Sequence, residues 1–364
     1  MLHERLILEN GKQSMSSQWQ HFQATFEAVG ANPMDGLIRA RDRAVVCDLA
    51  HNALIAFEGP DAEGFLHSQL SSDVESLSMD RCQLSTYNSP KGRVLATLLL
   101  WRCDDGIVLQ LPAAIAESIR RRLSMFILRA KVRASLADER FVRIGVGGPN
   151  ARTVLTAAGL QPPDADFALV RRKQVRHGEN LVDIELAMRL PGGRYELLVT
   201  NADAAISTWH SLVAHGATPA APATWRWLTL SSGVADVVAE TQDQFVAQML
   251  NYELIGGVSF TKGCYPGQEI VARTQYRGEI RRRTLLAHAA DGNEPAPAQA
   301  IFNAVTPDQA VGAVVNAAPS PKGGFDLLAC LHTELAAAAN LHLGKVGGPR
   351  LELLTLPYSL PSPG

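Results

Sequence analysis

The chain has 364 residues, of which 46% are hydrophobic and 19% charged, and its formal net charge is −2. This length and apolar content allow a large core divided into two or three domains, and the nearly neutral charge excludes a protein that coats nucleic acid, so we expect no direct nucleic-acid partner. No stretch approaches 18 apolar residues and the first residues lack the apolar segment of a secretory signal, so we expect no membrane partner and a cytoplasmic protein.

The five cysteines are widely separated in the sequence and no two form a CxxC pair. This spacing excludes a local zinc or ferredoxin-type motif and indicates a reducing compartment, so we predict no metal site built by this chain alone. The cysteines are Cys47, Cys82, Cys103, Cys264 and Cys330.

A polar helical pattern runs from Met15 to Gly30, and we assign residues 1–30 to an N-terminal extension and helix. Either Met1 or Met15 could be the natural start.

An internal repeat follows. Ile55–Leu66 reappears as Ile144–Leu155, and in each copy a short apolar strand runs into Gly-Pro, a polar cap and a helix. The segments after the two copies are also alike, so we predict an α+β fold with two interleaved ferredoxin-like lobes in residues 31–285, with repeat units at about 50–136 and 140–216.

The elements of the two lobes follow from periodicity and turn residues. In the first lobe we predict a hairpin of Cys82–Asn88 and Gly92–Trp101, a strand at Ile107–Leu111, and a helix from Pro112 whose apolar face is Ile115, Ile119, Leu123 and Phe126. In the second we predict a hairpin of Asn180–Leu190 and Tyr195–Thr200 and a helix capped by Asp203, followed by a helix start or strand at Trp225–Leu230.

The composition changes after Arg283, where a Pro/Ala-rich break precedes short apolar runs separated by Gly and Pro. Such runs favour a small antiparallel β-barrel or sandwich, and we assign residues 286–364 to a C-terminal β-barrel. Its predicted strands are Ala310–Val315, Phe325–Leu331, Leu341–Val346 and Leu351–Leu356.

Cys264 is the most chemically suggestive residue. It lies between Gly263 and Pro266-Gly267, so its thiol is expected on a loop, and many cations are close in sequence. Positive charge favours thiolate, which makes Cys264 either a nucleophile or soft-metal ligand, or else a structural cysteine on a tight turn. The cations are Lys262, Arg273, Arg277, Arg281, Arg282 and Arg283.

The segment around Cys264 resembles the signature region of the YgfZ proteins, folate-binding relatives of the glycine-cleavage aminomethyltransferase, or T-protein. Their motif Lys-Gly-Cys-[Phe/Tyr]-x-Gly-Gln-Glu matches Lys262–Glu269 without a gap, and the similarity spans most of Ile55–Arg283. It includes Gly59–Ala62, Phe65-Leu66, Asp73-Val74 and Lys91–Arg93.

The resemblance implies two ferredoxin-like lobes and a C-terminal barrel around a folate-binding opening. It also implies assistance in the synthesis or repair of iron-sulfur clusters in client proteins, including enzymes that thiolate tRNA. The cofactor would be tetrahydrofolate or a derivative, the partners would be Fe-S client or carrier proteins, and the chain would contact a partner's cluster transiently. We expect a monomer.

The T-protein reaction is the alternative, a folate-dependent one-carbon transfer. T-proteins place an aspartate just after an Asn-x-x-Gly-Gly turn, whereas here the turn Asn88–Gly92 leads into the strand Arg93–Thr97, which has no acid. Because a general acid or base must lie within hydrogen-bond reach, we expect neither aminomethyl transfer nor a conventional enzyme.

Folate contacts are assigned from the same resemblance. Glu196 aligns with the glutamate that T-proteins use on the pterin, and Tyr195 precedes it; the alternative for Glu196 is an outward strand residue. Arg93 would hold the glutamyl tail or else lie on the surface. The T-protein arginine near Trp225 is replaced by Thr229, with Arg226 three residues earlier.

The remaining assignments lie in the signature loop. Lys262 would lower the pKa of Cys264 or hold an anion, and Tyr265 would cover the folate opening or pack. Gln268 would pair with loop amides or open a helix, and Arg273, with Arg277, would contact folate carboxylates or a partner if Ile270–Tyr276 is helical. Cys264 would join cluster ligands from a partner, act as a thiol on it, or be secondary to folate.

Overall fold

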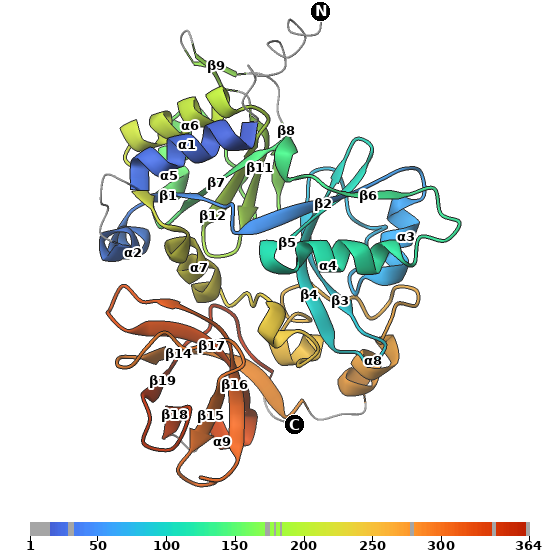
Figure 1. The fold of residues 1–364 in the computed structure, drawn as a ribbon, viewed down its shortest axis with the longest axis vertical. Helices are drawn as coiled ribbons and strands as arrows, with labels where there is room; N and C mark the ends of the chain where they lie inside the picture. Colours follow the sequence, from blue (N-terminus) through green and yellow to red (C-terminus); the bar gives the residue numbers. More distant parts are fainter. Residues whose placement is uncertain are drawn as a thin grey trace, which may run out of the picture.

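The computed structural model describes residues 15–27, 33–171, 175–177, 180–182, 184–276, 280–336 and 340–361. Figure 1 shows two sheet-based lobes side by side and a barrel beneath them. None of the described helices is both long and apolar enough to cross a bilayer.

The first lobe is a five-stranded antiparallel sheet in the order β3-β4-β5-β2-β6. Helices α3 and α4 cover one of its faces, because their apolar residues, such as Phe65, Ile115 and Ile119, pack with Ile55 and Leu109 of the sheet. The elements are β2 (Asn52–Glu58), α3 (Ala62–Gln69), β3 (Cys82–Asn88), β4 (Val94–Cys103), β5 (Gly106–Pro112), α4 (Ala113–Ser124) and β6 (Arg133–Leu136).

The second lobe is a six-stranded sheet in the order β13-β1-β7-β12-β11-β8. Strand β1 precedes the first lobe in sequence but pairs with β7, so the two lobes are interleaved. The elements are β1 (Val45–Asp48), β7 (Val142–Gly147), α5 (Ala151–Ala157), β8 (Leu169–Arg171), β11 (Ile184–Leu190), β12 (Arg194–Val199), α6 (Ala202–Ala214) and β13 (Thr218–Ala220).

Further elements surround these sheets. Helix α1 (Met15–Glu27) lies alongside α6 (Figure 1). The two helices pack through Trp19 and Trp209, whose ring centroids are 5.7 Å apart. The others are α2 (Pro33–Asp42), η1 (Asp138–Arg140), the hairpin β9 (Val175–His177) and β10 (Asn180–Val182), α7 (Pro222–Ser231), η2 (Ala239–Thr241), η3 (Ala247–Leu250) and α8 (Gln268–Tyr276).

The two copies of the repeat have the same local geometry. Asp61 and Asn150, which begin the helices, have φ/ψ of −101°/6° and −97°/6°, and the alanine after each is buried. Three predictions in the lobes were wrong. Asn201 rather than Asp203 caps α6, because its side chain accepts the Ala204 N–H at 2.7 Å. Phe126 lies beyond α4 and is 49% exposed, and Asn180–Leu190 forms two strands instead of one.

The C-terminal region closes into a six-stranded antiparallel barrel, which confirms the predicted fold class. Its first strand, β14, begins at Arg282, four residues before the predicted boundary, and neither β14 nor β15 was predicted. The strands are β14 (Arg282–Ala289), β15 (Ala300–Asn303), β16 (Ala310–Pro319), β17 (Phe325–His332), β18 (Leu341–Leu343) and β19 (Arg350–Leu354), with α9 (Thr333–Ala336) after β17.

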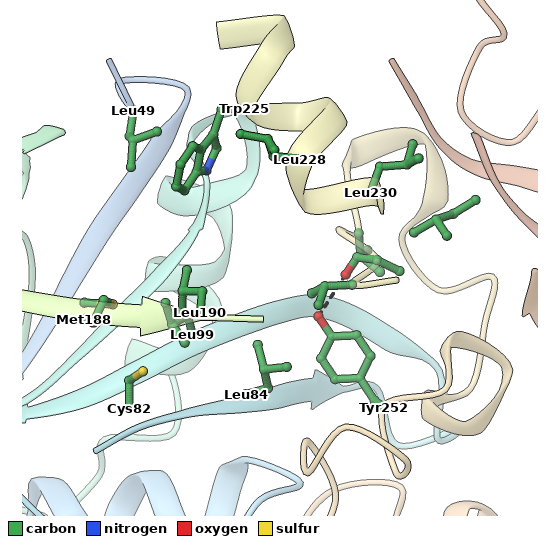
Figure 2. Packing of buried hydrophobic residues seen from close by; sticks show 14 of the residues in the cluster. Leu49, Cys82, Leu84, Leu99, Met188, Leu190, Trp225, Leu228, Leu230 and Tyr252 are labelled. Atoms are coloured by element: carbon green, nitrogen blue, oxygen red, sulfur yellow. Dashed lines mark hydrogen bonds between the residues drawn. The ribbon is translucent and has the colours of Figure 1, made fainter. Parts of the chain in front are cut away.

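One apolar core joins the three bodies. The inner faces of the two sheets contribute residues such as Leu99 and Met188, the barrel contributes Leu328, and α7 inserts Trp225 among them (Figure 2). Trp225 is 1% exposed. Burying a side chain of this size stabilises the fold by about 2–3 kcal/mol, so α7 fixes the spacing of the lobes around the polar cavity described next.

Candidate functional site

The site has two parts, a cavity between the lobes and a loop that carries the exposed cysteine. This cavity, with about 600 Å³ of space between atoms when open solvent is included, is lined by both sheets, α7 and the segment after it. Its polar lining comes from His51, Asn52, Thr97, Gln110, Arg194, Glu196, Arg226, Thr229, Asp236 and Tyr252.

Glu196 lies inside this cavity because successive side chains of β12 point to opposite faces of the sheet. Along β12, Leu198 faces the central core on the same side as Glu196, whereas Tyr195 and Leu197 face the other core. The Glu196 carboxylate is 1% exposed and accepts hydrogen bonds from Gln110 Nε2 at 2.9 and 3.2 Å. Burial raises its pKa, while the Gln110 hydrogen bond and Arg194 oppose that rise. Glu196 is therefore a cavity residue and not the outward strand residue of the alternative.

Gln110 was missed by the sequence analysis. Its Oε1 is buried and has no hydrogen-bond partner among the described residues, although its amide group binds Glu196. An unpaired buried acceptor is costly, and a bound donor would relieve that cost. The available signal was a single polar residue in the apolar strand Ile107–Leu111.

Arg194 is fixed between β12 and α7. Its guanidinium donates to Pro191 O at 3.0 Å, Thr229 Oγ1 at 2.8 Å and Ser232 Oγ at 3.0 Å, and it lies 5.5 Å from the centroid of the Trp225 ring. Burial lowers its pKa, and the carboxylates of Glu196 and Asp236 oppose that shift. Arg194 thus acts on both cavity carboxylates, and Arg143 also acts on Glu196.

Asp236 was also missed. It lies in the segment after α7, which is held by reciprocal hydrogen bonds of 2.8 Å between the Asp236 backbone and the Asn316 side chain of the barrel. Burial raises the pKa of Asp236 to about 6, and Arg194 opposes the shift. An acid within the apolar run Gly233–Val238 was the signal that the sequence offered.

The cavity rim carries an exposed arginine. Arg226 lines the cavity, and the structure shows no ion pair to its guanidinium from the described residues. Beside it, burial and the charge of Arg226 lower the pKa of His51 to about 4, so His51 is neutral. Thr229, which takes the place of the T-protein arginine, accepts from Arg194 instead.

Tyr195 and Arg93, which were predicted to contact folate, do not line this cavity. Tyr195 points to the opposite face of β12, as its packing in the second-lobe core shows. Arg93 Nη1 donates to Gln244 O at 2.6 Å, so this guanidinium ties the hairpin after β3 to the segment before the signature loop. Neither side chain therefore reaches the pocket in which Glu196 lies, and their predicted contacts with the pterin and the glutamyl tail stay predictions.

The signature loop docks on the β3–β4 hairpin through two glycines. Gly92 has φ +69° and Gly267 has φ +77°, and a Cβ on Gly267 would lie 2.5 Å from Gly92 Cα and from Ser89 O. Only residues without a side chain allow this approach of two backbones. The motifs Lys91–Arg93 and Lys262–Glu269, which are far apart in sequence, thus meet in one place.

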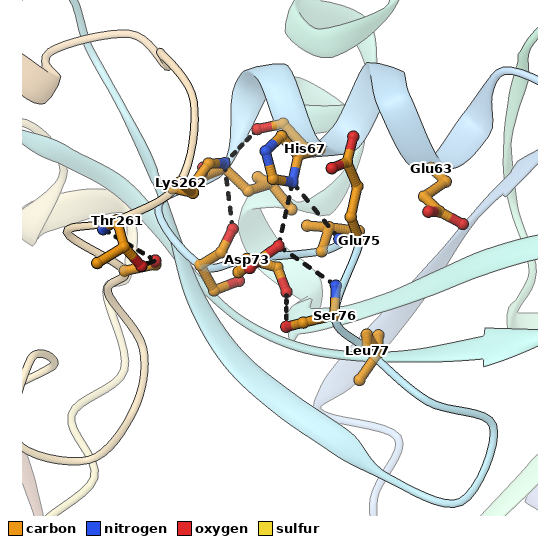
Figure 3. A network of polar contacts seen from close by, with 12 residues as sticks. Glu63, His67, Asp73, Glu75, Ser76, Leu77, Thr261 and Lys262 are labelled. Atoms are coloured by element: carbon orange, nitrogen blue, oxygen red, sulfur yellow. Dashed lines mark hydrogen bonds and ion pairs between the residues drawn. The ribbon is translucent and has the colours of Figure 1, made fainter.

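Lys262 fixes the other side of the loop (Figure 3). Its ammonium donates to Leu70 O at 2.7 Å, to Ser72 O at 3.1 Å and to His67 O, and it lies 5.1 Å from the centroid of the Tyr265 ring. Burial lowers its pKa to about 8, while Asp73 and Glu75 oppose this shift. All three N–H donors are in use, so Lys262 anchors the loop to the end of α3.

Cys264 is exposed on this loop, whereas Cys47, Cys82 and Cys330 are buried and Cys103 is partly buried. The neighbouring Gly263 faces an imidazole, since a Cβ built on it would lie 3.8 Å from His67 Nε2. His67 Nδ1 is 3.4 Å from Asp73 Oδ1 (Figure 3), so a His–Asp pair, missed from the sequence, adjoins the loop.

The other loop residues lie around α8. Tyr265 is buried, and burial raises its pKa to about 12; Gln268 begins α8, and Arg273 is exposed on that helix. Arg283 is buried and paired with Glu253, so it adds no cation at the thiol. Arg277 lies outside the described residues. None of these loop residues lines the central cavity in the described part of the chain.

Comparison with known proteins agrees with this architecture. The family model of the GCVT N-terminal domain matches residues 14–255. A tRNA-modifying protein YgfZ from Edwardsiella ictaluri (strain 93-146) is 32% identical over 306 residues, which cover 84% of this chain and 89% of that protein. One from Serratia proteamaculans (strain 568) is 29% identical over 311 residues, 85% of this chain and 90% of that protein.

The fold is that of a solved T-protein. The glycine cleavage system aminomethyltransferase T from Bartonella henselae superposes with a TM-score of 0.71 at 17% identity, and 90% of each chain is covered. The resemblance drawn from the signature loop is thereby confirmed. The chain belongs to the GCVT N-terminal domain family and, within it, to the YgfZ proteins.

Proposed function

We propose that this protein is a folate-binding accessory factor for the synthesis or repair of iron-sulfur clusters in client proteins, including enzymes that thiolate tRNA. The observation that carries the proposal is the pairing of an acceptor-rich interlobe cavity with one exposed cysteine on a docked loop. The cavity would hold the folate, and Cys264 would meet the client.

The cavity residues fit a pterin. The amino-pyrimidine edge of a pterin presents N–H donors, and Glu196 together with the unpaired Gln110 Oε1 offers acceptors for them. Leu84, Leu99 and Trp225 supply apolar walls. Bound tetrahydrofolate would supply a carrier of one-carbon units.

Arg226 replaces Arg93 in the proposal as the cation for the glutamyl tail. Its guanidinium is exposed at the cavity rim, whereas the Arg93 guanidinium is bound to Gln244 O. A rim position suits a flexible, charged tail that stays in water, because an arginine pairs with carboxylate without losing all its hydration.

Cys264 is proposed as the thiol that acts on the client. An iron-sulfur cluster takes four ligands, and three of the other cysteines are buried inside the lobes and the barrel. Cys264 therefore either joins ligands of the partner around the cluster or acts as a thiol on the partner. Arg273, exposed on the helix after the loop, would face that client.

Two measurements test the two parts of the proposal. Calorimetry with tetrahydrofolate should show binding to the wild type and a loss of at least tenfold in affinity for Glu196→Ala. Glu240→Gln, which changes an exposed acid, is the control.

In cells that lack the protein, Cys264→Ser and Cys264→Ala should fail to restore Fe-S enzyme activity, while both variants still bind folate. Cys103→Ser is the matched control. Full restoration by both Cys264 variants would refute the thiol role.

One observation favours a second candidate, a folate-dependent one-carbon transferase. The strand after Asn88–Gly92 has no acid, but Asp236 brings a carboxylate into the same cavity from another segment. Steady consumption of a methylated or aminomethylated donor with tetrahydrofolate, abolished in Asp236→Asn, would support this candidate over the accessory role.

A further inference from the structure

The cavity holds a second carboxylate that the proposed contacts to the amino-pyrimidine edge do not use. Glu196 and Gln110 form one hydrogen-bonded unit, whereas the Asp236 carboxylate accepts no hydrogen bond from the part of the chain that the structure describes. Its backbone alone is bonded, to Asn316. Asp236 is partly buried, so its carboxylate is an acceptor that a ligand in the cavity can reach.

Asp236 is also held in place on both sides. The barrel side chain Asn316 binds its N–H and its carbonyl, and the N–H of the next residue, Val237, donates to Thr97 Oγ1 of β4 at 2.9 Å. Both Asn316 and Thr97 are partly or fully buried. The backbone of Asp236 is therefore held at a set position on the cavity wall, which keeps the carboxylate next to the cavity.

The groups around Glu196 and Asp236 favour a ligand that donates hydrogen bonds, since Arg226 lies at the rim of the cavity. Arg194 is the cation beside Asp236 and Glu196, and its Nε and both Nη atoms already donate to Pro191, Thr229 and Ser232. Two carboxylates and the free Gln110 Oε1 remain as acceptors. With the amino-pyrimidine edge on Glu196 and Gln110, as proposed, Asp236 would accept an N–H from another part of the ring.

We propose that Asp236 distinguishes the reduced pterin ring from the oxidised one by accepting a ring N–H that only the reduced ring has. A tetrahydropterin has N–H groups at N5 and N8, whereas both nitrogens of the fully oxidised ring carry lone pairs. A carboxylate facing a lone pair is repelled and loses its hydration without compensation, so the oxidised ring is rejected. The inference rests on the proposed folate binding and identifies the residue that selects the reduced ring.

Calorimetry with tetrahydrofolate and with folic acid tests this selection. We expect the wild type to bind tetrahydrofolate at least tenfold more tightly than folic acid. Asp236→Asn should reduce that preference to less than about threefold, because an amide can donate to a lone pair as well as accept an N–H. Glu240→Gln, which changes an exposed acid four residues along the chain, should keep the wild-type preference.

The outcomes separate this inference from the proposed function. If the wild type binds neither folate, the proposed function falls and the inference falls with it. If the wild type binds both forms equally, or if a folded Asp236→Asn keeps the full preference, the selection by Asp236 is wrong while folate binding stands. The wild-type comparison needs no variant, so a poorly folding Asp236→Asn does not prevent the test.

Discussion

The carboxyl group of Asp236 is unfavourable in the fold when it is charged, so the stability of the protein depends on pH through this group. Burial raises its pKa from 3.8 to about 6, so the folded state holds a proton that the unfolded chain releases between these pH values. Stability therefore falls through this group as pH rises from about 4 to 6 and stays lower above. Arg194, Glu196 and Tyr252 are the charged or titratable groups that face it.

Asp236→Asn should therefore stabilise the protein at pH 7.5, by up to about 3 kcal/mol for a shift of about two pKa units. The gain should shrink toward zero below pH 4, where the wild-type carboxyl is protonated in both states. Urea unfolding of both proteins at pH 7.5, 5.5 and 4 measures it. A variant less stable than the wild type at pH 7.5 would show that the carboxylate has a stabilising partner.

Lys262 makes the opposite contribution, because its ammonium satisfies three backbone carbonyls at the end of α3. Lys262→Met keeps much of the aliphatic chain but leaves those carbonyls without their donor, at a cost of about 1–3 kcal/mol. We expect faster amide exchange in residues 259–267 with little change in β5 and β12. Lys91→Met, an exposed lysine on the facing hairpin, is the control, and equal exchange in both variants would contradict the anchoring role.

At the scale of elements, the contact between the signature loop and the β3–β4 hairpin depends on Gly267. Gly267→Ala would place a Cβ 2.5 Å from backbone atoms of Ser89 and Gly92, in addition to the strain of a positive φ. We expect the loop to leave the hairpin and the variant to lose at least about 2 kcal/mol in urea unfolding.

Gly256→Ala separates the clash of a new Cβ from the strain of a positive φ. Gly256 also has a positive φ, +82°, but a Cβ there meets nothing within 4 Å, so only the backbone strain of about 1 kcal/mol is expected. Fe-S enzyme activity in cells should fall for Gly267→Ala and persist for Gly256→Ala. Equal losses of stability and activity in both variants would show that Gly267 does not act by letting the two backbones dock.

The limits of prediction also lie at this scale. Both ends of β3 follow from its local pattern, Glu196 was proposed from the resemblance to T-proteins, and Cys264 was proposed from its motif. The cavity itself was not predicted, because Gln110 and Asp236 become neighbours of Glu196 only through long-range packing of three segments. The sequence shows Arg93 as a cation but does not show the Gln244 carbonyl that it binds. Strand β14 was missed because its first residues were interpreted as the end of the basic segment.

At the scale of the whole molecule, α7 connects the barrel with the cavity. Trp225 and Thr229, one turn apart, line the cavity, whereas Trp227 Nε1 donates to Asp326 Oδ2 of the barrel strand β17 at 2.7 Å. Asp326 Oδ1 lies 2.7 Å from His288 Nδ1 of β14. The barrel therefore sets the position of a helix whose other face forms the proposed ligand site.

Trp227→Phe tests this connection, because it keeps the aromatic packing but leaves one oxygen of a carboxylate that is 5% exposed without its donor. We expect a loss of about 1–3 kcal/mol in urea unfolding and a weaker affinity for tetrahydrofolate, although Trp227 does not line the cavity. A double-mutant cycle with Asp326→Asn should give a coupling energy of at least about 0.5 kcal/mol. Unchanged affinity in a destabilised Trp227→Phe would mean that the barrel supports the fold without holding the ligand site in place.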